Sequence, residues 1–177
     1  ITPRYFTNIN EWRTNAIFAL PPQQIQSIQL DFPKEPNKSW KINKSESNSL
    51  GFEINYLQTG ELFSAIDTGY LARYIKRYEM VYFEGFEETK TQNYIDSIIG
   101  TTPEQIYTVT DTQGNSTEIK VYLKPVKKGS EDYDGNPIDY DLDRLYGYLN
   151  NQDFVVIQHV IFDPLEKHPE DFLKKTI

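Results

Sequence analysis

Cysteine is absent from this chain of 177 residues. Its absence excludes disulfides, thiol catalysis, iron–sulfur clusters and cysteine-type zinc sites. It does not indicate a cellular compartment, because a chain of this length buries roughly 70% of its unfolded surface and needs no covalent staple. Aromatic residues are abundant instead, with 13 Tyr and 10 Phe, so we expect both core and surface to be rich in tyrosine.

Positive charge is scarce, since 18 Lys and Arg stand against 26 Asp and Glu, for a net charge of -8. Binding of nucleic-acid phosphates requires a cationic face. The only basic cluster consists of Lys120, Lys124, Lys127 and Lys128. We therefore expect no nucleic-acid partner.

Long apolar runs are also missing. No segment approaches the ~20 apolar residues that span a bilayer, and no signal segment is visible. The sequence opens with Ile-Thr-Pro-Arg and lacks an initiator Met, so we expect it to be part of a longer protein.

Alternating apolar residues predict strands in both halves of the chain. The strands are expected at residues 25–32, with a change of face near Ser27, and at 39–44, 50–56, 81–86, 105–111 and 117–124. A polar loop at 125–139 and a hairpin of 143–149 and 154–162, turning at Asn150 and Asn151, are expected after these.

Apolar residues at helical spacing predict a helix from Asp67, its N-cap, to Met80. A shorter helix is expected at 94–99, with Gly100 as a left-handed cap. Together with the strands, these helices indicate an α+β fold, mainly an antiparallel sheet with packed helices.

Two stretches of the chain match each other, Pro22–Ile28 and Pro103–Val109, which begin 81 residues apart. Each follows a segment that begins with an aromatic residue, Trp12 or Tyr94. We expect one α+β domain over 1–177, built from repeat units 1–88 and 89–177 that share a core. A chance match is the alternative, because proline before an alternating strand is common.

Residues 131–143 contain six acids and no base. The acids are Glu131, Asp132, Asp134, Asp139, Asp141 and Asp143. The last three resemble the start of a calcium loop, but Arg144 and Asn150 occupy the positions that require Gly and Glu. An extended 139–143 would place the three Asp on one face and pack Tyr140 and Leu142 on the other. We expect a solvated acidic loop; a weak calcium site is the alternative.

The two histidines do not indicate catalysis. His159 is expected in a strand and His168 in an exposed segment, and neither has metal-ligand spacing. No G-x-S-x-G or phosphate-binding glycine loop occurs. We expect no catalytic, cofactor-binding or metal-binding residues; a hydrolase with paired carboxylates distant in sequence remains an alternative.

Six segments of the chain carry a family resemblance: Ile1–Phe18 followed by Pro-x-x-Ile-x-x-Ile, Val81–Phe86, Asp111-x-x-Gly114, Gly135-Asn136-Pro137, Asp143-Arg144-x-Tyr146 and Val156-x-Gln158. In these segments the sequence resembles certain Bacteroidetes envelope proteins, in or close to the domain-of-unknown-function family 4340. The segments cover nearly the whole chain but include no catalytic signature.

The resemblance implies that this chain is the C-terminal part of a protein anchored in the inner membrane, lying in the periplasm, with transport components near some relatives. We therefore expect a non-catalytic accessory module that binds envelope proteins, including the preceding section of its own chain. The alternatives are a carbohydrate- or peptide-binding module and, less favoured, a carboxylate hydrolase.

Overall fold

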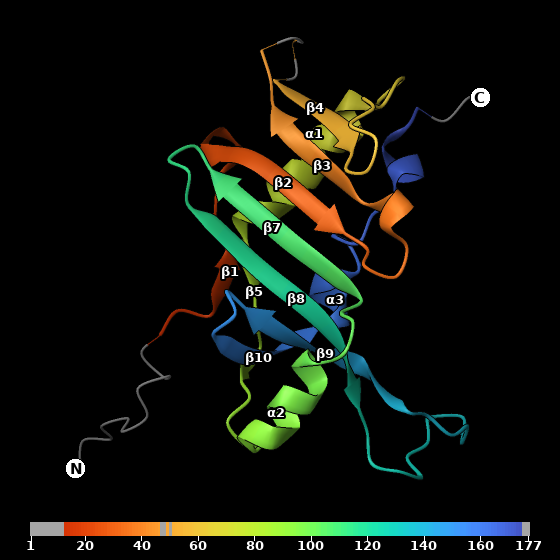
Figure 1. Ribbon diagram of the computed structural model, residues 1–177. Coiled ribbons are helices and arrows are strands. Elements are labelled where there is room, and N and C mark those ends of the chain that lie inside the picture. Colours follow the sequence, from red (N-terminus) through yellow and green to blue (C-terminus); the bar gives the residue numbers. More distant parts are fainter. Residues whose placement is uncertain (1–12, 47–48, 50, 175–177) are drawn as a thin grey trace, which may run out of the picture.

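The computed structural model describes residues 13–46, 49 and 51–174 and has an α+β fold (Figure 1). Its main element is an eight-stranded antiparallel sheet with the order β4-β3-β2-β7-β8-β9-β10-β6. The strands are β2 (Ile25–Asp31), β3 (Trp40–Lys44), β4 (Phe52–Tyr56), β6 (Gly85–Phe86), β7 (Gln105–Asp111), β8 (Ser116–Pro125), β9 (Tyr140–Leu149) and β10 (Asp153–Gln158). The expected fold class is confirmed.

A second, two-stranded antiparallel sheet consists of β1 (Ala16–Phe18) and β5 (Val81–Tyr82). The single strand expected at 81–86 is therefore wrong, because β5 pairs with β1 while β6 pairs with β10. The helices are α1 (Thr68–Lys76), α2 (Gln92–Ile99) and α3 (His159–Phe162). Single 3-10 turns lie at Pro22–Gln24, Pro36–Lys38, Arg77–Glu79 and Pro169–Phe172.

One face of the large sheet packs against α1, α3 and the terminal 3-10 turn. Trp40 of β3 is fully buried, with its ring centroid 5.7 Å from that of Tyr74 in α1 and 4.9 Å from that of Phe172. Tyr107 of β7 packs at 5.5 Å against Phe162 of α3. The core therefore draws on both halves of the chain, and burial of each such side chain stabilises the fold by about 1.5–3 kcal/mol.

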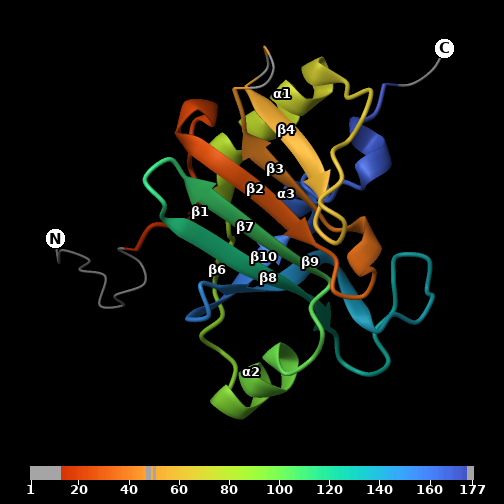
Figure 2. The same cartoon turned by 45° about the horizontal axis from the view of Figure 1, so that its top comes forward.

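The opposite face of the sheet is covered at one end only. There α2 packs over a second apolar cluster, whose buried members are Tyr122, Tyr146 and Phe154 from β8, β9 and β10. The ring centroids of Tyr94 in α2 and Tyr146 lie 6.3 Å apart. Figure 2 shows α2 beside this end of the sheet, away from β2, β3 and β4.

Several local predictions are confirmed. The Asp67 carboxylate accepts the N–H of Tyr70 at 2.8 Å and caps α1. Asn150 and Asn151 have φ of 51° and 55°, as a tight two-residue hairpin turn requires. The β2–β7 register shifts between Ile25 and Ser27, which is the expected change of face.

Two local predictions are wrong. Gly100 has φ -74° and ψ -9°, in the right-handed region; the helix end closes instead by the Thr101 N–H donating to the Ile98 carbonyl at 3.0 Å. The last strand ends at Gln158, and His159 begins α3, because the chain must turn there to bury Phe162.

The predicted duplication has a geometric counterpart. In the large sheet β2, β3 and β4 follow one another outward on one side of the β2–β7 pair, and β7, β8 and β9 do so on the other. The matching sequence stretches end in β2 and β7, which are neighbours. The duplication itself stays a prediction. The described residues do not include 1–12, which contain Trp12 and the first part of the family resemblance, or Leu50.

Candidate functional site

The acidic segment between β8 and β9 forms an ordered arm, defined here as residues 126–139. It projects from the body of the molecule in both ribbon views (Figures 1 and 2). Backbone hydrogen bonds cross it from the N–H of Val126 to the carbonyl of Asp139 (3.0 Å), from Ile138 to Ser130 (3.0 Å) and from Asp132 to Asn136 (2.8 Å). The expected polar loop is thus a hairpin that extends the β8–β9 pair.

The tip of the arm is held by one carboxylate. Asp132 Oδ1 accepts the N–H groups of Asp134 at 2.9 Å and Asn136 at 2.8 Å. Gly135 has φ 81°, a conformation that favours glycine. Hydrogen bonds from the Asn136 side chain and from the backbone hold the pKa of Asp132 below its usual value. Asp132 therefore stabilises the turn at the tip of the arm, and its Oδ1 is already used as a hydrogen-bond acceptor.

A shallow hollow of about 270 Å³ lies between the arm and the first residues of β9. Its apolar lining includes the half-buried Val126 and Ile138. Tyr133 and Leu142 also line it and are 99% and 54% exposed. We name this feature the arm hollow; its lining is completed by the acids Glu131, Asp132, Asp141 and Asp143.

The expected packing of Tyr140 and Leu142 against the body is wrong. The two side chains are 45% and 54% exposed. At this point β9 has left the core: its register with β8 shifts between Leu123 and Pro125. Side chains still alternate between the two faces of β9 here, but no other described element covers Tyr140 or Leu142.

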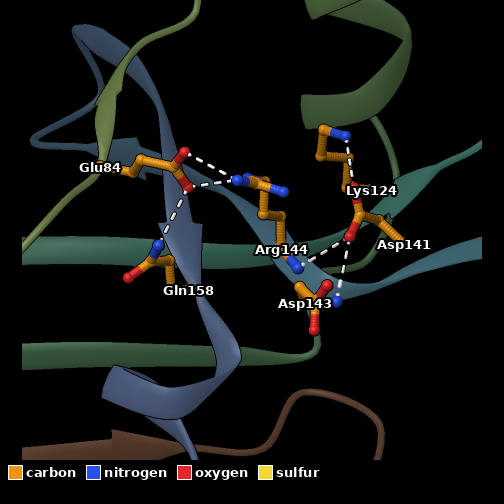
Figure 3. A network of polar contacts seen from close by, with 6 residues as sticks. All are labelled: Glu84, Lys124, Asp141, Asp143, Arg144 and Gln158. Atoms are coloured by element: carbon orange, nitrogen blue, oxygen red, sulfur yellow. Dashed lines mark hydrogen bonds and ion pairs between the residues drawn. The ribbon is translucent and has the colours of Figure 1, made fainter.

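A polar network fastens the base of the arm to the body (Figure 3). The Glu84 carboxylate, between β5 and β6, accepts from Arg144 Nε at 2.8 Å and Nη2 at 3.0 Å. Gln158 Nε2 donates to the same carboxylate at 3.3 Å. The paired geometry raises the pKa of Arg144 and lowers that of Glu84. Nothing local in the sequence predicts this contact, because the two partners are 60 residues apart.

Asp141 occupies the other half of this network. Its Oδ2 accepts from Lys124 Nζ at 2.7 Å, and its Oδ1 accepts the N–H groups of Asp143 and Arg144 at 3.0 Å each (Figure 3). Burial alone would raise the pKa of Asp141, but these hydrogen bonds together hold it below its usual value. Asp141 is therefore a structural anion whose charge is already matched.

Two further hollows lie on the sheet face that carries α2. The first, about 300 Å³, is lined by Lys34 and Glu104, which form an ion pair with each other. The second, about 210 Å³, includes Asp153, whose carboxylate pairs with Arg13 at 2.6 Å. Ligand sites are usually at least as large and aim several polar groups at the ligand, whereas these charged groups are directed at each other.

The two histidines lie apart from the arm. His159 Nδ1 is 3.1 Å from Asp163 Oδ1 within α3, not in a strand. His168 was expected to be exposed, but it is half-buried and its ring stacks on Phe32 with centroids 4.8 Å apart. Neither histidine therefore belongs to a cluster with the acidic segment.

The described part of the chain contains no group of three His, Asp or Glu side chains placed to hold a metal ion. It also contains no helix long and apolar enough to cross a membrane. Comparisons with family models, curated proteins and solved structures found no match for the chain. The resemblance to family 4340 stays a prediction.

Proposed function

We propose that this chain is a non-catalytic protein-interaction module of the cell envelope, and that the arm is its binding element. The observation that carries the proposal is an ordered arm that exposes Tyr133, together with the exposed Leu142 of the adjoining β9, which lines the same hollow. Exposed apolar side chains grouped at one place mark interaction surfaces. Binding to a preformed element loses little conformational freedom, which favours affinity.

The network at the base supports this role. Glu84, Arg144, Lys124 and Asp141 connect the start of β9 to β8 and to the β5–β6 link. They orient the arm relative to the core without contributing to the arm hollow's apolar lining. An arm with a fixed direction can present the same surface to each partner molecule.

The envelope setting rests on the family resemblance alone. We propose a periplasmic location, attachment to the inner membrane through a segment outside this chain, and an association with transport components. The partners would be envelope proteins, including the preceding section of the same polypeptide.

In vivo photo-crosslinking of the full-length protein tests the proposal. A photoreactive amino acid replaces Tyr133 in the arm or, as the control, Leu62, an exposed apolar residue beside β4. We expect a discrete protein adduct from position 133 in native membranes and none from position 62. Absence of any protein adduct from these and other surface positions would contradict an interaction role. An adduct from other positions but not from 133 would contradict the role of the arm.

A further inference from the structure

We infer that the arm hollow accepts an apolar side chain of a protein segment flanked by Lys or Arg. This inference rests on the proposed function, because it names the chemistry of the partner that the arm binds.

The hollow can accommodate one apolar side chain. Ile138 forms part of its floor, and Tyr133 and Leu142 stand beside it. At about 270 Å³ and open to solvent, it suits a single inserted side chain better than an enclosed small molecule. An aromatic or aliphatic side chain inserted into such a hollow typically contributes most of the binding free energy of a protein–protein contact.

The charged side chains that line the hollow are all acidic. Residues 131–143 carry six acids and no base. Lys124 is matched by Asp141, and Lys127 and Lys128 do not line the hollow. Of the acids that line the hollow, Glu131 and Asp143 form no ion pair with any described residue, so the local field favours a cationic partner and opposes an acidic one.

The purified 177-residue chain can be tested with three synthetic peptides. The first has a central Leu between lysines, the second replaces Leu with Gly, and the third replaces the lysines with Glu. Binding is measured by calorimetry and by amide chemical-shift changes. We expect the first peptide to bind at the arm, about tenfold or more tighter than either control, and less tightly as salt rises.

Variants locate the site. Tyr133→Ser with Leu142→Ser should reduce affinity for the first peptide about tenfold, and Glu131→Gln with Asp143→Asn should reduce its salt dependence. The matched control, Met80→Ser with Val160→Ser, removes two exposed apolar side chains outside the arm and should leave binding unchanged.

Several results would overturn the inference. They are equal binding of the three peptides, an equal loss in the Met80/Val160 control, or a self-association abolished by Tyr133→Ser with Leu142→Ser, which would assign the hollow to a second copy of the chain. Failure here with a protein adduct still formed at position 133 refutes the partner chemistry alone. Absence of all adducts refutes the interaction role itself.

Discussion

Ile28 and Val109 lie directly opposite each other in the ladder between β2 and β7. They are also the last residues of the two matching stretches, Pro22–Ile28 and Pro103–Val109. Equivalent residues face each other across an antiparallel pair when two copies of one unit join about a local two-fold axis. The pair therefore lies where the two predicted repeat units meet.

Shortening Ile28 should weaken this junction. The side chain is fully buried, so Ile28→Ala leaves a cavity and should lower the free energy of unfolding by about 2–5 kcal/mol. The control, Gln26→Ala, alters an exposed residue of the same strand and should change it by less than about 0.5 kcal/mol. Urea denaturation followed by circular dichroism measures both, and equal losses would contradict the position of the junction.

Separated halves should not fold alone. Fragments 1–88 and 89–177 each expose one side of the β2–β7 junction, and the core uses residues from both. We expect neither fragment to show a cooperative thermal transition, and their mixture to regain strand signal in circular dichroism. A cooperative transition in either fragment would show that its half has an independent core.

Gly147 should not tolerate a side chain. A Cβ there would lie 2.7 Å from Ile119 Cδ1 and 3.0 Å from Val155 Cγ2. Gly147→Ala should therefore destabilise the protein by about 1–3 kcal/mol through overpacking. Gly85→Ala is the matched control on β6, because its Cβ would meet nothing within 4 Å. Chemical denaturation that ranks the control as the more damaging change would contradict this packing.

The Glu84–Arg144 pair should contribute stability only above acidic pH. The hydrogen bonds from Arg144 hold the folded-state pKa of Glu84 below its usual value, so the contribution of the pair is complete above the unfolded pKa of about 4.3 and is lost as pH falls through the lower folded value. Both side chains are partly exposed, at 34% and 42%, so screening by solvent keeps this contribution small.

Glu84→Gln should accordingly lower stability at neutral pH and reduce the loss seen on acidification. Glu170→Gln, which removes an exposed carboxylate with no ion pair among the described residues, should do neither. Urea titrations of the three proteins at neutral pH and below pH 4 measure the difference. Parallel pH profiles for Glu84→Gln and the unsubstituted chain would contradict the sign of this linkage.

Calcium should not stabilise the arm. Asp132 is hydrogen-bonded within the turn, and Asp141 to Lys124 and the β9 backbone. The described residues also contain no group of three His, Asp or Glu side chains placed to hold a metal ion. The melting temperature should be the same with millimolar calcium and with chelator, whereas Asp132→Ala should lower it in both. A calcium-dependent rise of several degrees, reversed by chelator, would overturn this expectation.

Short-range features were predictable from the sequence for a physical reason. Asp67, the Asn150–Asn151 turn and the Ser27 change of face are each decided within a few residues, by a side chain meeting nearby N–H groups or by the conformations that a residue type allows. The Asp111 hairpin is of this kind too: its Oδ1 accepts the N–H of Gln113 at 2.8 Å and of Asn115 at 2.9 Å.

The candidate site was predictable only in part. The acidic composition of residues 131–143 drew attention to this segment. Alternation, however, shows only which side chains share a face of a strand, and not whether another layer covers that face. For this reason the expected packing of Tyr140 and Leu142 was wrong. The base of the arm is held by Arg144 meeting Glu84, a contact that forms only once β9 lies near the β5–β6 link. Such contacts leave no local signal in the sequence.

The arm continues two ten-residue strands, β8 and β9, whose hydrogen bonds run across the strand direction. A partner that pulls along the arm would thus load the β7–β8 and β9–β10 ladders in shear, straining many hydrogen bonds at once. Tension between a partner bound at the arm and this domain would therefore pass directly into the interior strands of the eight-stranded sheet, and the hairpin would act as a mechanical coupling between the two.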